Sequence, residues 1–297
     1  MVSRLLSALD ARIARTRDPL QNDCLRAERA TLLARQGRLD EARAELDRIR
    51  ARHAAKPNAV VTAWVCLGEG MVVYYGSLGI AARDRFLRAL ALSEAAHARR
   101  VVALSAAWLA QMDFATQDFA ALSRHLPHAL KYAEPDQHSA LSRACLVAAE
   151  AFHWAERFDL AMPWYARARH HATFEGDESM LSALMHNMAW LRVAEYRRRE
   201  VAGELGHAEA RQAKLSAESI AQFDGMVGIG VLEDPWSPCC ARQVLILEGH
   251  ARKRWNCWRQ INAEGVLASR RLTAELAWCE GRHRVVPFER CGDSKDW

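Results

Sequence analysis

The chain has few of the residues that mark low-complexity or β-rich proteins. Proline and glycine account for only 8 and 15 of its 297 residues, too few for a collagen-like or linker-like chain. Hydrophobic residues make up 51% and charged residues 26%, a balance that allows a sizeable core and excludes disorder throughout. Strand character is almost missing, because residues 226–232 are the one stretch both β-branched and punctuated by glycine. The composition therefore favours a helical globular protein.

A strong excess of one charge is also absent. The net charge is +5, and residues 1–60 hold thirteen basic against eight acidic side chains, so the remainder balances. Within that segment arginines alternate with carboxylates, as on a solvated helix face. Nucleic-acid binding usually needs several basic residues clustered on one face. Nucleic acid is therefore not an expected partner.

Signals for secretion and for membrane insertion are weak. Arg4, Asp10 and Arg12 interrupt the N-terminal segment, which excludes the apolar core of a secretory signal and favours a cytoplasmic location. Val60 to Ala82 is long enough to cross a bilayer and carries Glu69 as its sole charge. Four glycines and this glutamate divide the stretch, and the repeat described below places two helices there. We expect no membrane span.

Motifs that carry chemistry are missing as well. The sequence has no Cys-x-x-Cys, Gly-x-Ser-x-Gly or His-Glu-x-x-His, and its glycines form no phosphate-binding loop. Its eight cysteines fall at no recognised metal-ligand spacing, and in a chain without a secretion signal they are expected to stay reduced. The sequence therefore predicts no enzyme, no catalytic residue, no metal and no cofactor.

An internal repeat is present instead. One apolar residue, often small, is followed four and seven positions later by further apolar residues, at intervals of 40, 40, 39 and 40 residues. Spacing of this kind defines one face of a helix. The five sets are Ala42/Leu46/Ile49, Ala82/Phe86/Ala89, Leu122/Leu126/Ala129, Ala161/Tyr165/Ala168 and Val201/Leu205/Ala208.

A second column of small residues precedes the first. Twelve residues before each set stand Ala30, Gly70, Ala110, Ala149 and Ala189. Small side chains on the facing sides of two consecutive helices allow the helix axes to approach closely. The sequence therefore predicts an all-α solenoid of about five antiparallel helix pairs.

Parts of this pattern resemble the tetratricopeptide repeat (TPR) family. The best match is residues 145–168, and the resemblance covers about residues 20–220. The period of about 40 residues exceeds the usual 34 of that family, and Asp113 and Arg192 replace the large apolar residue of the first helix in the third and fifth units. Longer units of this kind look like the arrays of bacterial regulators and adaptors. The matching residues of the best unit are Ala149, Phe152, Phe158, Ala161, Tyr165 and Ala168.

The resemblance implies a function in recognition. In that family the first helices line a concave face on which an extended peptide or a partner's helix lies. We therefore expect a non-catalytic scaffold or adaptor whose partner is a protein or peptide; the oligomeric state stays open. The alternative is a sensory or regulatory module of a bacterial transcription or signalling system. From the phase of the first helices we predict that the following residues lie on the binding face: Ala27, Thr31, Glu69, Leu146, Glu150, His153, His186 and Trp190.

The repeat pattern ends near residue 230. We expect an N-terminal helix in residues 1–20, the helical repeat array in residues 21–230 and an irregular segment in residues 231–297. The last segment contains five of the eight cysteines and five of the ten tryptophans. Two hypotheses account for this composition: a frameshifted tail over residues 250–297, or an atypical cap that covers the last core face.

Overall fold

The computed structural model describes residues 4–77, 81–155, 157–188, 215 and 219. Every regular element in these residues is a helix, so the predicted all-α class is confirmed for the described part. Residues up to Leu184 belong to one compact unit, and Met185 begins a second. A further helical stretch covers residues 178–188. The elements are α1 (Arg4–Arg15), α2 (Pro19–Arg35), α3 (Leu39–Arg52), α4 (Ala59–Ser77), α5 (Ala82–Ala95), α6 (Arg99–Thr116), α7 (Phe119–Tyr132), α8 (His138–Trp154) and α9 (Phe158–Glu175).

Local sequence signals set the helix ends. Asp18 caps α2 by accepting a hydrogen bond from the Leu20 amide, and Pro19 occupies the first turn, where no amide hydrogen is needed. At the other end of α2, Gly37 adopts a φ of 76°, a left-handed conformation that glycine reaches without penalty. The Arg38 amide then donates to the Leu33 carbonyl at 3.0 Å, which closes the helix.

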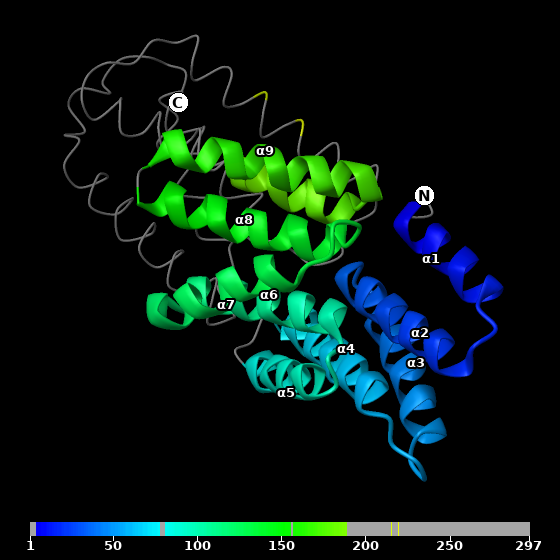
Figure 1. Cartoon of the computed structure of the whole chain (residues 1–297). Helices are drawn as coiled ribbons and strands as arrows, with labels where there is room; N and C mark the ends of the chain where they lie inside the picture. The colour runs from blue at the N-terminus through cyan, green and yellow to red at the C-terminus, as the bar shows by residue number, and fades with distance from the viewer. Residues whose placement is uncertain (1–3, 78–80, 156, 189–214, 216–218, 220–297) are drawn as a thin grey trace, which may run out of the picture. The chain divides into compact units, whose positions relative to one another are not determined.

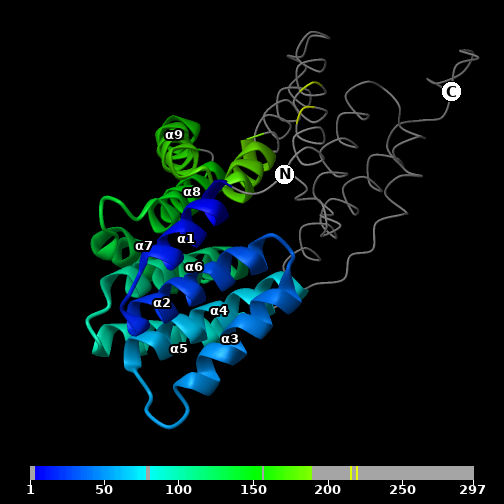
Figure 2. The same ribbon diagram turned by 90° about the vertical axis from the view of Figure 1, so that its right-hand side faces the viewer.

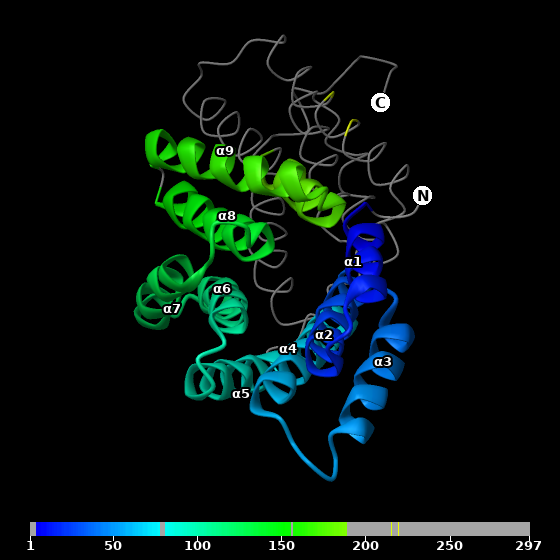
Figure 3. The same cartoon turned by 45° about the vertical axis from the view of Figure 1, so that its right-hand side comes forward.

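Successive helices pack against one another in a regular order. Four short connections join the helix pairs α2/α3, α4/α5, α6/α7 and α8/α9, and the two helices of each pair are in contact. The first helices also contact each other, α2 with α4, α4 with α6 and α6 with α8 (Figures 1 and 3). Helix α1 packs on α2, beside the first helices (Figure 2).

The residues of the repeat columns lie in the core. All members of the first, second and fourth sets are buried, as are Ala30, Ala110 and Ala149 of the preceding column. In the third set Leu122 and Ala129 are buried, and Leu126 is partly buried against the core. The fifth set and Ala189 lie outside the described residues. The helical periodicity therefore identified the packed faces of four helix pairs.

Gly70 shows why this column needs small residues. A Cβ atom at Gly70 would lie 2.5 Å from Cε1 of Phe86, the central residue of the second set. Real Cβ atoms do not approach another carbon so closely, so α4 and α5 would have to separate. The absence of a side chain on α4 thus makes room for the buried aromatic ring of α5.

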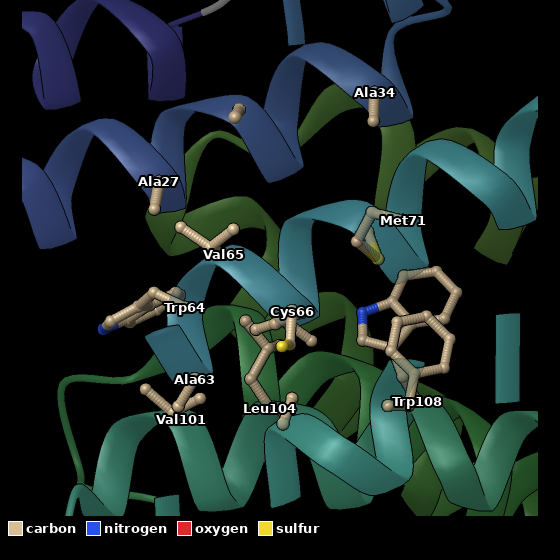
Figure 4. Close-up of a cluster of buried hydrophobic side chains, with 14 of the residues drawn as sticks. Ala27, Ala34, Ala63, Trp64, Val65, Cys66, Met71, Val101, Leu104 and Trp108 are labelled. Carbon is tan, nitrogen blue, oxygen red and sulfur yellow. The ribbon is translucent and has the colours of Figure 1, made fainter. Parts of the chain in front are cut away.

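Helix α4 occupies the centre of this core. Within the described residues it is the one helix long and apolar enough to cross a membrane, and 56% of its most apolar 18-residue stretch is buried in the protein. Trp64, Val65, Cys66 and Met71 from α4 lie among side chains of α2 and α6, including Trp108 (Figure 4). Contacts with neighbouring helices on several sides account for its apolar composition.

The tryptophans Trp64, Trp108 and Trp154 do not share one environment. Trp64 and Trp108 are buried, as packing between helices requires. Trp154, at the end of α8, is 50% exposed and has an edge-on contact with Phe114. Trp154 is the last residue of α8, and its ring is therefore less enclosed than the rings of Trp64 and Trp108.

Candidate functional site

A cavity of about 260 Å³ lies beside the first helices of the successive pairs. Side chains from α1, α2, α4, α6, α8 and α9 form its walls, together with Asp136 from the loop before α8. Side chains far apart in the sequence thus meet at one site, within the unit that ends at Leu184.

Part of the cavity wall is apolar. Met71 of α4 and two residues of α6, Leu104 and Trp108, stand close together in the buried cluster of Figure 4 and also line the cavity. Apolar residues of α1 and α2 complete this part of the wall. Such a surface suits the hydrocarbon part of a bound group. Its members are Leu5, Leu9, Leu32, Met71, Leu104 and Trp108.

A buried ion pair connects α2 to the residues after α9. Arg35, which lines the cavity, contacts Asp177 through Nη1 at 2.8 Å and Nη2 at 2.9 Å, and both side chains are more than nine-tenths buried. Burial lowers the pKa of the Arg35 guanidinium, but Asp177, with smaller contributions from Tyr75 and Glu175, outweighs this effect and raises the pKa above its ordinary value. The guanidinium therefore remains charged, and the ion pair joins residues 142 positions apart.

Asp177 also begins the following helical stretch. Its Oδ1 accepts a hydrogen bond from the Met180 amide at 3.0 Å, which is an N-terminal cap. Nearby, the Arg4 amide of α1 donates to the Glu178 carboxylate at 3.3 Å. The beginning of α1 and the end of α2 are thus both attached to the turn after α9.

A second group of charges surrounds Glu28 of α2. Arg100 forms ion pairs with Glu134 at 3.1 Å and with Asp136 at 3.0 Å. Burial raises the pKa of the Glu28 carboxyl, and the positive charges of Arg12 and Arg100 offset this increase only in part. Glu28 therefore holds a proton to higher pH than an exposed glutamate does.

Glu175, the last residue of α9, also lines the cavity and has a strongly perturbed carboxyl group. Burial and the neighbouring carboxylates Asp177 and Glu28 raise its pKa to about 8, against the smaller opposing effects of Arg35 and Arg100. Its Oε2 atom is buried and has no hydrogen-bond partner among the described residues. An enclosed polar atom of this kind usually marks a site that a ligand or water completes.

Two histidines stand at the α8 and α9 side of the cavity. His138 lines the cavity, and its Nδ1 lies 2.9 Å from Nδ1 of His171. Burial lowers the pKa of both imidazoles. The charge of His170 lowers the pKa of His138 further, against an opposing effect of Asp136, and the charges of His138, His170 and Arg167 lower the pKa of His171. Both rings are therefore neutral at pH 7. Among the described residues no group of three or more potential ligands surrounds a common point where a metal ion would bind.

Most of the residues that helix phase predicted for the binding face do not line the cavity. Thr31 lines the cavity, and its hydroxyl donates to the Glu28 carbonyl at 2.6 Å. Ala27 and Leu146 are buried in the packing and offer no accessible surface. Glu69 forms ion pairs with Arg50 of α3 and Arg85 of α5, so second helices hold its carboxylate.

The remaining nominated residues do not line the cavity. Glu150 accepts a hydrogen bond from Gln111 at 3.4 Å, and His153 lies 3.3 Å from the Tyr165 hydroxyl. His186 belongs to the second unit, and Trp190 lies outside the described residues, as does the whole irregular segment 231–297.

Sequence reasoning missed most of the charged cavity residues. Arg12 and Glu28 look like ordinary charges of solvated helix faces, and the run from Glu175 to Asp177 indicates only a break between helices. Nothing in a local pattern signals that Arg35 contacts a residue 142 positions away.

Comparison with known proteins adds no relative. A scan against protein-family models and a search of curated proteins both found no match to this chain.

Proposed function

We propose that this chain is a non-catalytic scaffold of TPR-like helical repeats that binds an extended peptide or a helix of a partner protein in the cytoplasm. The observation that carries the proposal is the cavity beside the first helices α2, α4, α6 and α8. First helices are the ones expected to face the partner in a helical solenoid.

The chemistry of the cavity fits recognition better than catalysis. Apolar side chains form one part of its wall and charged groups another, which is the usual composition of a binding pocket. Among the charged groups, Arg35 is engaged with Asp177, and Asp136 is engaged with Arg100. A peptide would place one side chain in the cavity and extend along the neighbouring helices.

A selection from a random-peptide display library on the immobilised full chain tests this function. Ala8 of α1 lines the cavity and is exposed, so Ala8→Trp fills the cavity without disturbing the core. Ala14→Trp is the matched control, because Ala14 is an exposed residue of the same helix and does not line the cavity.

We expect related peptides to be enriched on the wild-type chain and on Ala14→Trp, and to be lost on Ala8→Trp. Circular dichroism and melting temperature would establish that both variants fold alike. The proposal is wrong if no peptide is enriched, or if the selected peptides bind Ala8→Trp as tightly as the wild-type chain.

A further inference from the structure

The charged groups around the cavity differ in whether they have a partner. Arg35 forms a bidentate ion pair with Asp177, and Arg100 forms ion pairs with Glu134 and Asp136. These cations are thus already neutralised by carboxylates within hydrogen-bond distance.

Arg12 is the remaining cation of the cavity wall, and its positive charge acts on Glu28. Glu175 is the carboxylate left over. Its Oε2 is buried and lacks a hydrogen-bond partner among the described residues, and it lines the cavity together with the apolar residues Leu104 and Trp108. Within the described part of the chain, the site therefore lacks a hydrogen-bond donor at Oε2, and a donor that is also a cation would match the ionised form of Glu175.

We propose that the cavity accepts one cationic side chain, an arginine or lysine of the bound peptide, whose charged end donates a hydrogen bond to Glu175 and whose methylene groups lie against the apolar wall. This inference rests on the proposed function and specifies its partner: a peptide with a basic residue at the position that enters the cavity. Long basic side chains combine these two properties, because their stems are apolar and their ends charged.

The other groups near the site are consistent with this occupant. His138 and His171 are neutral at pH 7, so they do not repel a cation. An anionic ligand would place a further negative charge beside Glu28, Asp136 and Glu175, and each uncompensated charge in such a site is costly.

The site also predicts a proton linkage. Glu175 keeps its proton up to a pH of about 8 in the free protein, and a bound cation would favour the ionised form. Binding at pH 7 should therefore release a proton. The affinity should rise about tenfold per pH unit as the pH approaches 8, and it should level off above that value.

Isothermal titration calorimetry with the full chain tests the proposal. The probe is the acetylated, amidated tripeptide Leu-Arg-Leu, and its control is the same tripeptide with citrulline, which keeps the shape of arginine without the charge. Titrations at pH 7 in phosphate and in Tris, which differ in ionisation enthalpy, measure proton release. The protein variants are Glu175→Gln and, as a control that also removes one exposed negative charge, Glu41→Gln on α3.

We expect the arginine tripeptide to bind wild type and Glu41→Gln about 10- to 100-fold more tightly than the citrulline tripeptide, the range for a charged hydrogen bond. Proton release should accompany binding of the arginine tripeptide. Glu175→Gln should lose both the preference and the proton release. Equal affinity for the two tripeptides, or unchanged proton release in Glu175→Gln, would overturn the inference.

Two further measurements separate the sources of the cation and the two proposals. Spermidine binding as tightly as the arginine tripeptide would identify a free polyamine as the occupant and overturn the peptide assignment; we expect it to bind more weakly. Library-selected peptides that Ala8→Trp excludes but that contain no basic residue would leave the proposed function intact and show that this inference is wrong.

Discussion

The ion pair between Arg35 and Asp177 offers the sharpest test of how the described unit is held together. Asp177→Asn keeps the cap on the Met180 amide, because asparagine is as good an N-terminal cap as aspartate. The substitution therefore removes one charge and little else. It leaves the Arg35 guanidinium buried without a counterion.

The expected loss in the free energy of unfolding is large for a substitution that exchanges one carboxylate oxygen for an amide nitrogen. Two charges about 4 Å apart attract by about 4 kcal/mol at an effective dielectric constant near 20. Experiments on buried pairs show that removing one partner costs about 3–5 kcal/mol, since the remaining charge is uncompensated. We expect Asp177→Asn to lower the free energy of unfolding by about that amount.

Urea denaturation of the full chain, followed by tryptophan fluorescence, measures this loss. Asp47→Asn is the control, because Asp47 forms an ion pair with Arg50 in which both side chains are more than half exposed, and it should cost no more than about 0.5 kcal/mol. The double variant Arg35→Met/Asp177→Asn should be more stable than Asp177→Asn alone, since it buries no unpaired charge. Equal stability of Asp177→Asn and Asp47→Asn, or a double variant that loses the sum of the single effects, would refute the reasoning.

Gly70→Ala should destabilise the chain by about 1–3 kcal/mol in the same urea assay, because its Cβ would overlap the Phe86 ring at 2.5 Å. Gly76→Ala, whose Cβ would have ordinary contacts beginning at 3.6 Å, should be neutral or stabilise by up to about 1 kcal/mol; a larger loss at Gly76 than at Gly70 would contradict the packing argument. Burial and Asp177 raise the pKa of Glu175 from 4.5 to about 8, so the folded state keeps a proton that the unfolded state loses. Stability should therefore fall between pH 4.5 and 8, by at most about 1.4 kcal/mol per pH unit, and urea titrations of Glu175→Gln should show a flatter pH profile than the wild-type chain; identical profiles would count against the buried carboxyl.

The core could be predicted from the sequence because its signal is local. Ala42, Leu46 and Ile49 stand on one face of one helix, and the same spacing recurs in the later units. The small residue twelve positions before each set lies on the preceding helix, which one short connection joins to the helix of the set. The close approach of Gly70 on α4 to Phe86 on α5 is an example. Contacts between the two helices of one pair recur about every 40 residues, so they can be predicted from the repeat in the sequence.

The candidate site could not be predicted in the same way. Its members come from six helices and from the loop before α8, and they meet only in the folded chain. A local sequence pattern does not contain contacts between elements so far apart in the sequence. Thr31 was found because it shares the phase of a first helix, whereas Glu175 and Asp177 stand at a helix end where phase carries no information.

The replacement of a large apolar residue by Asp113 in the third unit shows how a departure from the pattern is accommodated. Asp113 is fully buried in α6, and its carboxylate contacts Arg83 of α5 at 3.0 Å and His125 of α7 at 2.5 Å. Both partners stand next to column positions, Arg83 after Ala82 and His125 before Leu126, on the second helices that flank α6. The charge is therefore matched within the same layer of packing, and α6 keeps the phase of the other first helices. An aspartate in an apolar column thus predicts a basic residue on a neighbouring second helix rather than the end of the repeat.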